Sequence, residues 1–248
     1  MKGIILAGGN ATRLRPLTRV TNKHLLPVYN KPMIFYPIQT LADAGIQDIL
    51  LVMGGSNPGD FVRLLGDGRE FGLREIHYTF QEGAAGIAQA LGMAEDFADG
   101  EKIAVMLGDN ILEDNILQAA EDFKKQERGA KIFIKEVKNP RSYGVPEIEG
   151  KKIVSIVEKP EHPKTNYAVV GAYMYDPSIF QVIKTLKPSA RGEFEITDVN
   201  NHYIREGSMT HEILRGWWGD GGESFDSLLE AQNLAAEWEK KKRRPMAP

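Results

Sequence analysis

The first residues that could do chemistry lie in a loop near the amino terminus, Leu6-Ala7-Gly8-Gly9-Asn10-Ala11-Thr12-Arg13. Two adjacent glycines allow a ligand to approach backbone N–H groups, and Arg13 offers a planar guanidinium to phosphate oxygens. The spacing differs from a Walker A loop and from the Gly-x-Gly-x-x-Gly dinucleotide motif, because positions 10 to 13 contain no glycine. The loop therefore indicates a phosphate site of another kind, and a purely structural strand-to-helix turn is the alternative.

A second cation, Lys23, precedes Leu25-Leu26-Pro27. Pro27 and Pro32 restrict the backbone that follows, so Lys23 would project from a rigid support. We interpret Lys23 as a second phosphate ligand, although a single lysine is more often solvated at the surface.

Two aspartates stand in motifs that suit a metal ion. Asp109 follows the apolar run that ends at Leu107, and Asp220 lies in Trp218-Gly219-Asp220-Gly221-Gly222. Mg²⁺ takes one or two carboxylates and completes its shell with phosphate oxygens and water. We predict that Asp109 and Asp220 hold Mg²⁺ together, although each motif alone is also an ordinary turn. The chain has no cysteine and no histidine pair at i+3 or i+4, which argues against a zinc site.

Side chains suited to a base and a sugar follow. The Gln81 amide can donate and accept side by side, which matches N3–H and O4 of thymine or uracil, whereas cytosine offers the reversed pattern at that edge. Glu158 can accept hydrogen bonds from two sugar hydroxyls, and Lys159 can neutralise a sugar phosphate. The alternative for Gln81 is a turn at the start of a helix, and the alternative for Glu158 and Lys159 is an exposed ion pair.

The elements that position these residues read as an α/β fold. Short aliphatic runs predict buried parallel strands at Lys2–Ala7, Asp48–Met53 and Lys102–Leu107. Helical spacing of apolar residues lies between or after them, at Ile34–Gly45, Ile87–Ala94 and Ile116–Phe123. Alternating strands and helices predict a Rossmann-like, doubly wound sheet in three layers, α on β on α. Ligands bind beyond the carboxyl ends of such strands, where the glycine loop and Asp109 fall.

The pattern changes after residue 130. Strand-like segments at Lys131–Val137, Lys152–Glu158 and Tyr167–Tyr175 predict a mixed or antiparallel addition to the sheet. A last amphipathic helix, with Phe225, Leu228, Leu229 and Ala236 inward, runs into a basic segment, Lys240 to Arg244, that we interpret as a solvated helix end. We expect one domain over residues 1–248, with a nucleotide part at 1–130, a sugar-phosphate part at 131–222 and a helix at 223–242.

Composition excludes several classes of protein. The 248 residues contain 31 Lys and Arg against 34 Asp and Glu, a formal net charge of −3, which argues against a dedicated nucleic-acid binder. The apolar runs are much shorter than the roughly 18 residues of a membrane span. We therefore expect a cytoplasmic protein without nucleic-acid or membrane partners.

Together the motifs resemble those of the sugar-phosphate nucleotidyltransferase family. Its signature is Leu-Ala-Gly-Gly-x-Gly-Thr-Arg-Leu followed by Lys-x-Leu-Leu-Pro, and further matches lie at 31–37, 81–90, 107–110, 158–160 and 189–198. The resemblance extends from residue 1 to about residue 236. Ala11 stands where the family has glycine, which costs roughly 1 kcal/mol if the local φ is positive. Gly221 replaces the usual Thr or Ala, and we expect a short form without the family's C-terminal helical extension.

The resemblance implies a GT-A-like fold and Mg²⁺-dependent transfer of a thymidylyl group from dTTP to glucose 1-phosphate. The products would be dTDP-glucose, which supplies deoxysugars for cell-surface polysaccharide, and pyrophosphate. It also implies a homo-oligomer, a dimer or a tetramer. Its implied catalytic residues are Arg13, Lys23, Asp109 and Asp220, the last two as metal ligands. The other implied nucleotide ligands are Leu6, Gly8, Gly9, Thr12, Gln81 and Gly86, and the implied sugar-phosphate ligands are Asn110, Gly144, Glu158, Lys159, Val169 and Arg191.

Three alternatives remain from the residues themselves. The same chemistry could use UTP, or less favourably ATP, because a methyl group discriminates by only about 1–3 kcal/mol. A non-catalytic nucleotide-sugar sensor would keep the fold, but all four implied catalytic residues are present. An NAD-dependent oxidoreductase needs the dinucleotide glycine spacing, which the chain lacks.

Overall fold

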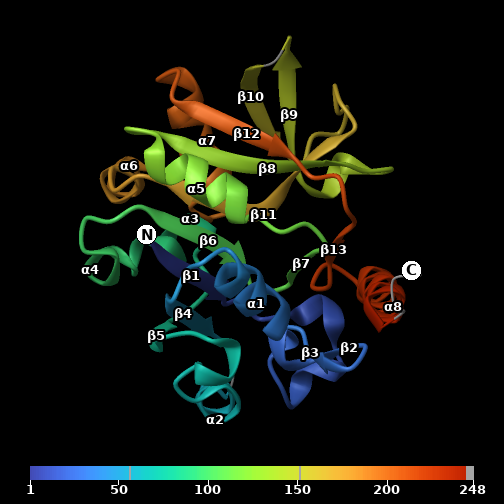
Figure 1. Ribbon diagram of the computed structural model, residues 1–248. Coiled ribbons are helices and arrows are strands. Elements are labelled where there is room, and N and C mark those ends of the chain that lie inside the picture. Colours follow the sequence, from blue (N-terminus) through green and yellow to red (C-terminus); the bar gives the residue numbers. More distant parts are fainter. Residues whose placement is uncertain (56, 151, 244–248) are drawn as a thin grey trace, which may run out of the picture.

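A seven-stranded mixed sheet forms the centre of the computed structural model, which describes residues 1–55, 57–150 and 152–243 (Figure 1). Its strand order is β12-β8-β11-β6-β1-β4-β5. The parallel part comprises β1 (Lys2–Ala7), β4 (Asp48–Gly54), β5 (Glu75–Gln81) and β6 (Ile103–Leu107). β11 (Tyr167–Tyr175) runs antiparallel to β6 and to β8 (Ala130–Glu136), and β12 (Met209–Ile213) is parallel to β8. The predicted mixed addition to a parallel sheet is confirmed.

Helices cover both faces of the sheet, which confirms the three-layer α/β class. Successive residues of β1 alternate between two cores, since Ile5 and Ala7 pack in one and Ile4 and Leu6 in the other. The first core is covered by α1 (Phe35–Asp43), α2 (Gly59–Leu65) and α5 (Leu117–Lys125). The second is covered by α3 (Ile87–Gly92), α4 (Glu95–Ala98), α6 (Ile179–Thr185) and α7 (Ile196–Arg205).

Three small antiparallel ladders lie outside the main sheet. They are β2 (Pro27–Val28) with β3 (Lys31–Pro32), β7 (Asn110–Leu112) with β13 (Trp218–Asp220), and β9 (Gly144–Glu149) with β10 (Lys152–Glu158). The expectation that 152–158 extends the main sheet is wrong, because β10 pairs with β9 in a separate hairpin. Figure 1 places this hairpin at one end of the molecule and α2 at the other. The described residues also form short 3-10 helices at Thr12–Leu14, Leu17–Arg19, Lys23–Leu25, Arg69–Phe71 and Pro140–Ser142.

The last helix, α8 (Phe225–Arg243), buries only part of the predicted face. Leu228 is inward as predicted and packs with Ala231 and Ala235 against a third core that includes Leu26, Val28 and Tyr36. Phe225 and Leu229, also predicted to be inward, are 47% and 56% exposed. The reason is that residues 228, 231 and 235 follow the 3-4 spacing of one helix face, and that face meets the β2–β3 loop region.

Two other helix predictions need correction. The periodicity through Ala94 is divided between two short helices, since α3 ends at Gly92 and Ala94 caps α4. Leu117, one of the apolar residues of the predicted Ile116–Phe123 helix, begins α5 and is 43% exposed.

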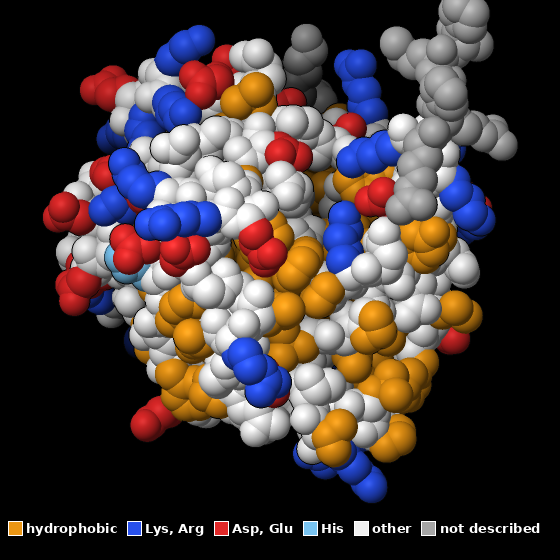
Figure 2. Space-filling view, turned by 60° about the horizontal axis from the view of Figure 1, so that its bottom comes forward, with side chains coloured by type: hydrophobic (Ala, Val, Ile, Leu, Met, Phe, Trp, Pro, Cys, Tyr) orange, Lys and Arg blue, Asp and Glu red, His pale blue; other side chains and the backbone are white. Residues whose placement is uncertain are grey.

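Charged and apolar side chains are unevenly distributed on the surface. On the face drawn in Figure 2, hydrophobic side chains gather over the middle and lower part of the view, and most charged side chains lie above and to the left of them. Lys240 and Lys242 are exposed, as expected for the basic helix end, and the Lys242 ammonium lies 3.6 Å from the centre of the Trp238 ring. Arg244 lies outside the described residues. No helix in the described part of the chain is long and apolar enough to cross a membrane.

Candidate functional site

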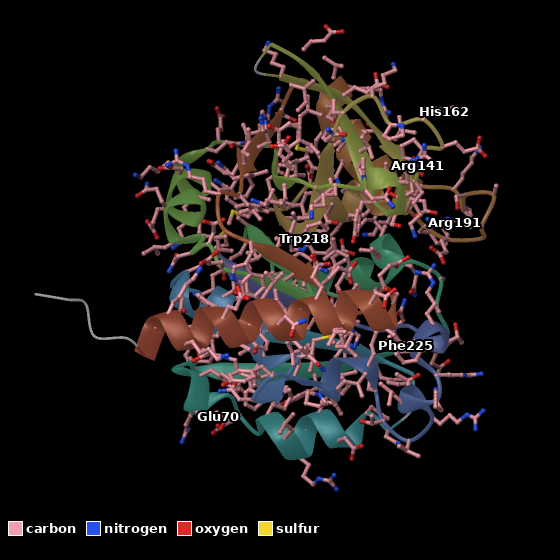
Figure 3. The ribbon with its side chains drawn as sticks, turned by 90° about the vertical axis from the view of Figure 1, so that its right-hand side faces the viewer. Glu70, Arg141, His162, Arg191, Trp218 and Phe225 are labelled. Atoms are coloured by element: carbon pink, nitrogen blue, oxygen red, sulfur yellow. The ribbon has the colours of Figure 1, made fainter. Side chains whose placement is uncertain are left out.

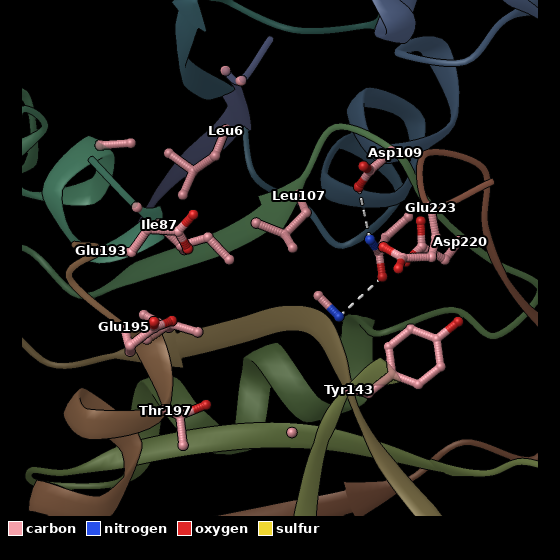
Figure 4. Close-up of a pocket in the computed structure, with 18 of the residues that line it drawn as sticks. Leu6, Ile87, Leu107, Asp109, Tyr143, Glu193, Glu195, Thr197, Asp220 and Glu223 are labelled. Atoms are coloured by element: carbon pink, nitrogen blue, oxygen red, sulfur yellow. Dashed lines mark hydrogen bonds between the residues drawn. The ribbon is translucent and has the colours of Figure 1, made fainter. Parts of the chain in front are cut away.

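A cleft of about 350 Å³ opens beyond the carboxyl ends of β1 and β6 (Figure 4). Its walls come from segments spread from Leu6 to Glu223. The cleft gathers almost every site residue predicted from the sequence: Leu6, Gly8, Gly9, Arg13, Lys23, Gln81, Gly86, Asp109, Asn110, Gly144, Glu158, Lys159, Val169, Arg191 and Asp220. Thr12 is the exception, because it lies in the 3-10 helix Thr12–Leu14 and lines an adjoining hollow with Gly9 and Lys23.

The two predicted metal ligands meet because two short strands pair. Asp109 directly precedes β7, Asp220 ends β13, and the register of this antiparallel ladder sets Asp220 opposite Asn110. The Gly221 N–H donates to the Asp109 carbonyl at 2.9 Å. A Cβ on Gly222 would overlap Oδ2 of Asp109, so the approach of these segments requires glycine at position 222.

Lys23 and Asp109 form a mostly buried ion pair. Nζ of Lys23 lies 2.5 Å from Oδ2 of Asp109, and the side chains are 17% and 11% exposed. Burial alone would raise the pKa of Asp109, but the Lys23 ammonium and the hydrogen bond from Asn110 Nδ2 hold that pKa below its usual value. Burial lowers the pKa of Lys23, but Asp109, through its charge and its hydrogen bond, and the charges of Asp220 and Glu223 together raise that pKa above its usual value. Both groups are therefore charged in the ligand-free cleft.

The pKa of Asp220 is shifted in the opposite direction from that of Asp109. Burial and the neighbouring Asp109 carboxylate raise the pKa of Asp220 to about 7, while Lys23 and the Gly222 N–H lower it in part. Two carboxylates thus share one ammonium at this point of the cleft. A divalent cation would relieve that imbalance.

The oxygen ligands of this pair fit magnesium better than a transition metal. Mg²⁺ uses one or two carboxylates and leaves the remaining positions to phosphates and water. Within residues 1–55, 57–150 and 152–243, no cluster of three or more His, Cys, Asp or Glu side chains could hold a metal ion. A metal ion held by this pair would therefore take its remaining ligands from a bound phosphate and from water.

Arg13 lines the cleft and has an acidic partner that the sequence did not indicate. Its guanidinium forms an ion pair with Glu223, and its side chain is 58% exposed. Glu223 follows the Gly221-Gly222 turn and lies beside Asp220 in Figure 4. An acid three residues after Asp220 was the available signal, but its partner is 210 residues away in sequence.

The phosphate loop contains a left-handed alanine. Ala11 has φ 45° and ψ 38°. The φ at residue 11 is therefore positive, which is the condition under which alanine at this position strains the loop. The Ala11 carbonyl accepts hydrogen bonds from the Thr18 hydroxyl and the Leu14 N–H, which hold this turn in place.

At the end of the cleft predicted for the base, Gln81 ends β5 and is 3% exposed. Its Oε1 lies so close to Gly8 that a Cβ there would be 2.5 Å away, so glycine at position 8 makes room for this amide. Gly86 has φ 103°, and a Cβ would lie 2.6 Å from the Phe194 carbonyl oxygen. Glycine is required at position 86 by this backbone contact, whereas its predicted contact with a base stays a prediction.

Another part of the cleft holds an arginine among carboxylates. Arg191, in the loop before α7, donates to both oxygens of Glu195 at 2.8–2.9 Å and lies 3.6 Å from Glu158 (Figure 3). Burial lowers the pKa of Arg191, but the carboxylates of Glu195, Glu193 and Glu158 together outweigh burial, so that this pKa lies above its usual value. Oε2 of Glu158 accepts a hydrogen bond from Thr197 at 2.7 Å, which fixes this carboxylate.

Asn110 and Lys159 are predicted sugar-phosphate ligands that also bond to the protein. Oδ1 of Asn110 accepts from the Gly171 N–H at 3.0 Å and from Trp218 Nε1 at 2.8 Å, while Nδ2 donates to Asp109. In the ligand-free cleft Asn110 therefore positions Asp109. Lys159 has φ 46°, and its N–H donates to the Tyr143 carbonyl at 3.0 Å.

Sequence reasoning missed the residues that position the others. Glu195 and Thr197 hold Arg191 and Glu158, Glu223 pairs with Arg13, and Gln89 bonds to Gln81. Glu195 and Thr197 lie inside the 189–198 segment already singled out, so that segment was the signal. Their partners became visible only with the fold.

Comparison with known proteins shows the family of this chain. A family profile described as "Nucleotidyl transferase" matches residues 2–237. A glucose-1-phosphate thymidylyltransferase from Neisseria meningitidis is 47% identical over 94% of this chain and 82% of its own length.

Two solved structures have the same fold. A Bacillus anthracis protein assigned as a glucose-1-phosphate thymidylyltransferase, in complex with sucrose, superposes with a TM-score of 0.91 at 47% identity, covering 100% of this chain and 98% of that one. A UDP-glucose pyrophosphorylase complexed with UDP-glucose is more distant, with a TM-score of 0.82 at 27% identity over 96% of this chain and 98% of the other. The chain thus belongs to the nucleotidyl transferase family, as its motifs predicted.

Proposed function

We propose that this protein transfers a thymidylyl group from dTTP to glucose 1-phosphate and releases pyrophosphate. One observation carries the proposal: a single cleft brings together Arg13 and Lys23, the Asp109–Asp220 pair, and the Arg191–Glu158 group, in a chain similar to glucose-1-phosphate thymidylyltransferases. The same cleft thus contains several cations, Arg13, Lys23, Lys159 and Arg191, together with a carboxylate pair. Two phosphorylated substrates need such cations to offset their negative charge.

The reaction is a direct in-line displacement. A phosphate oxygen of glucose 1-phosphate forms a bond to the α-phosphorus of dTTP, and the bond from that phosphorus to the oxygen bridging to the β-phosphorus breaks. The electron pair leaves with pyrophosphate, and dTDP-glucose remains. The attacking oxygen is already ionised at neutral pH, so no general base is needed.

The chain's own residues align two anions and neutralise their charge. Arg13 and Lys23 hold the triphosphate, and Lys159 and Arg191 hold the sugar phosphate. Gln81 reads the base, and Glu158 accepts hydrogen bonds from the sugar hydroxyls. Such alignment of two reactants contributes about 7–11 kcal/mol to lowering a barrier.

Asp109 and Asp220 would hold Mg²⁺. When bound, this ion neutralises charge on the phosphates at the reacting centre. The carboxylate pair, its excess negative charge and the position of both residues in the same cleft as the cations support the assignment. We further propose that the protein works as a homo-oligomer in the cytoplasm, where nucleoside triphosphates and sugar phosphates are available.

The test is pyrophosphate release with glucose 1-phosphate across dTTP, UTP, ATP, CTP and GTP, with EDTA as a control. Release that favours dTTP and stops with EDTA supports the proposal. A preference for UTP would keep the mechanism and change the substrate. Binding of nucleotide without release, with any of the five, would refute the enzyme and leave a sensor.

A further inference from the structure

The end of the cleft assigned to the base contains a pair of amide side chains that bond to each other. Nε2 of Gln81, at the end of β5, donates to Oε1 of Gln89, in α3, at 2.5 Å. Gln81 lines the cleft and is almost completely buried. Gln89 is half-buried and does not line the cleft. Any effect of Gln89 on a ligand therefore acts through Gln81.

The direction of this hydrogen bond decides what Gln81 offers to a ligand. In the described part of the chain, no group donates to Oε1 of Gln81, and no fully buried side-chain oxygen or nitrogen lacks a partner. Oε1 is therefore open to the cleft, beside Gly8. Nε2 keeps a second hydrogen, so the amide presents an acceptor next to a donor.

We propose that Gln89 is a positioning residue that sets base specificity by fixing the orientation of the Gln81 amide. The inference rests on the function proposed above. With Gln89 as acceptor, Oε1 of Gln81 receives N3–H of thymine or uracil, and the remaining Nε2 hydrogen bonds to the adjacent carbonyl. Cytosine presents a bare ring nitrogen beside an amino group. Pairing with cytosine would require a rotated Gln81 amide. Rotation would turn the Gln81 oxygen toward Oε1 of Gln89, so the hydrogen bond between the two side chains would be lost unless the Gln89 amide rotated as well.

The test distinguishes two roles of the side chain at position 89: accepting the hydrogen bond from Gln81, and filling the volume beside it. Gln89→Glu keeps the size and can only accept, so it keeps the Gln81 orientation. Gln89→Met fills a similar volume without accepting, so the Gln81 amide can rotate. The readout is the ratio of kcat/KM for dTTP to that for dCTP, with glucose 1-phosphate as second substrate.

We expect Gln89→Met to lower this ratio by roughly 3- to 10-fold, the size of one net hydrogen bond, and Gln89→Glu to keep it within about twofold of the wild type. The ratio for dTTP to dUTP serves as an internal control and stays unchanged, because both bases present the same edge. The KM for glucose 1-phosphate also stays unchanged. A wild-type ratio in Gln89→Met, or an equal fall in both variants, would overturn the proposal.

Equilibrium binding of dTTP and dCTP, measured without sugar phosphate, gives the same ratio without turnover. A wild-type protein that binds dTTP but releases no pyrophosphate would refute the proposed function alone. Equal dTTP-to-dCTP binding ratios in the wild type and Gln89→Met would refute the role of Gln89 alone.

Discussion

Acid should destabilise this protein through His24, the residue next to Lys23. The imidazole is 2% exposed, its Nδ1 lies 2.7 Å from Oδ1 of Asn22, and a Cβ on Gly108 would lie 2.7 Å from its ring. The ring thus holds the Lys23 turn against the residue that precedes Asp109. Burial and the Lys23 charge lower the pKa of His24 from its usual 6.5 to about 3.

The magnitude follows from linkage between folding and protonation. Below pH 6.5 the unfolded chain binds a proton at His24 that the folded chain does not, so stability falls as the pH falls. Between pH 7 and pH 5 this residue alone removes about 2 kcal/mol from the free energy of unfolding. The loss continues until the pH reaches the folded-state pKa near 3.

The assay is urea unfolding at pH 7, 6 and 5 for the wild type, His24→Gln and His162→Gln. His24→Gln should be less stable at pH 7, because it disturbs a packed site, but should lose about 2 kcal/mol less on going to pH 5. His162 is exposed, so its variant should follow the wild type. Equal pH dependence in the wild type and His24→Gln would refute the assignment of a buried neutral imidazole.

Three further predictions concern the phosphate loop and the carboxylate pair. Asp109→Asn should lower pyrophosphate release by roughly 100-fold or more with an unchanged circular-dichroism spectrum, and near-wild-type rates would contradict its role. Gly222→Ala should lower both activity and melting temperature, because its Cβ overlaps Asp109 and lies 2.8 Å from Lys23 Nζ. Its matched control, Gly221→Ala, meets only the movable Met33 methyl at 2.8 Å and should be mild, so equal effects would exclude the steric explanation. Ala11→Gly should change the free energy of unfolding by less than about 1 kcal/mol, since relief of left-handed strain and added chain entropy offset each other. Ala11→Val should destabilise by more than about 1 kcal/mol in urea unfolding, and a neutral valine would mean that residue 11 is not left-handed in solution.

The central strands could be predicted because their signal needs no knowledge of their neighbours. β1, β4 and β6 are buried on both faces, so each is a continuous aliphatic run, and their bounds agree with the prediction to within a residue. The edge strand β5 was missed because only Ile76 and Gln81 are buried in it. Phe225 and Leu229 of α8 were wrongly predicted to be inward for a related reason: several apolar stripes were available on this helix, and only the packing partner selects one.

The residues of the candidate site also fall into two groups, those that could be predicted from the sequence and those that became visible only in the fold. Residues expected to touch a ligand, such as Lys23, Asp109 and Arg191, carry charge in short motifs and could be found in the sequence. Residues that hold them, such as Gln89 and Thr197, are ordinary polar side chains until the fold sets them 2.5–2.7 Å from Gln81 and Glu158. Spacing along the chain carries no information about such contacts between distant segments.

The ion pairs of the ligand-free cleft bear on what it would bind. Lys23 is paired with Asp109, Arg13 with Glu223 and Arg191 with Glu195, so each of these cations already has a carboxylate partner. A free phosphate must separate such a pair and leave a carboxylate uncompensated, which is costly where the pair is buried, as at Lys23–Asp109. A nucleotide that arrives with a divalent cation supplies a positive charge for Asp109 and Asp220 as well as phosphates for Lys23 and Arg13. The cleft would therefore favour the complete metal–nucleotide complex over either component alone, which suits an enzyme that must not trap the pyrophosphate it releases.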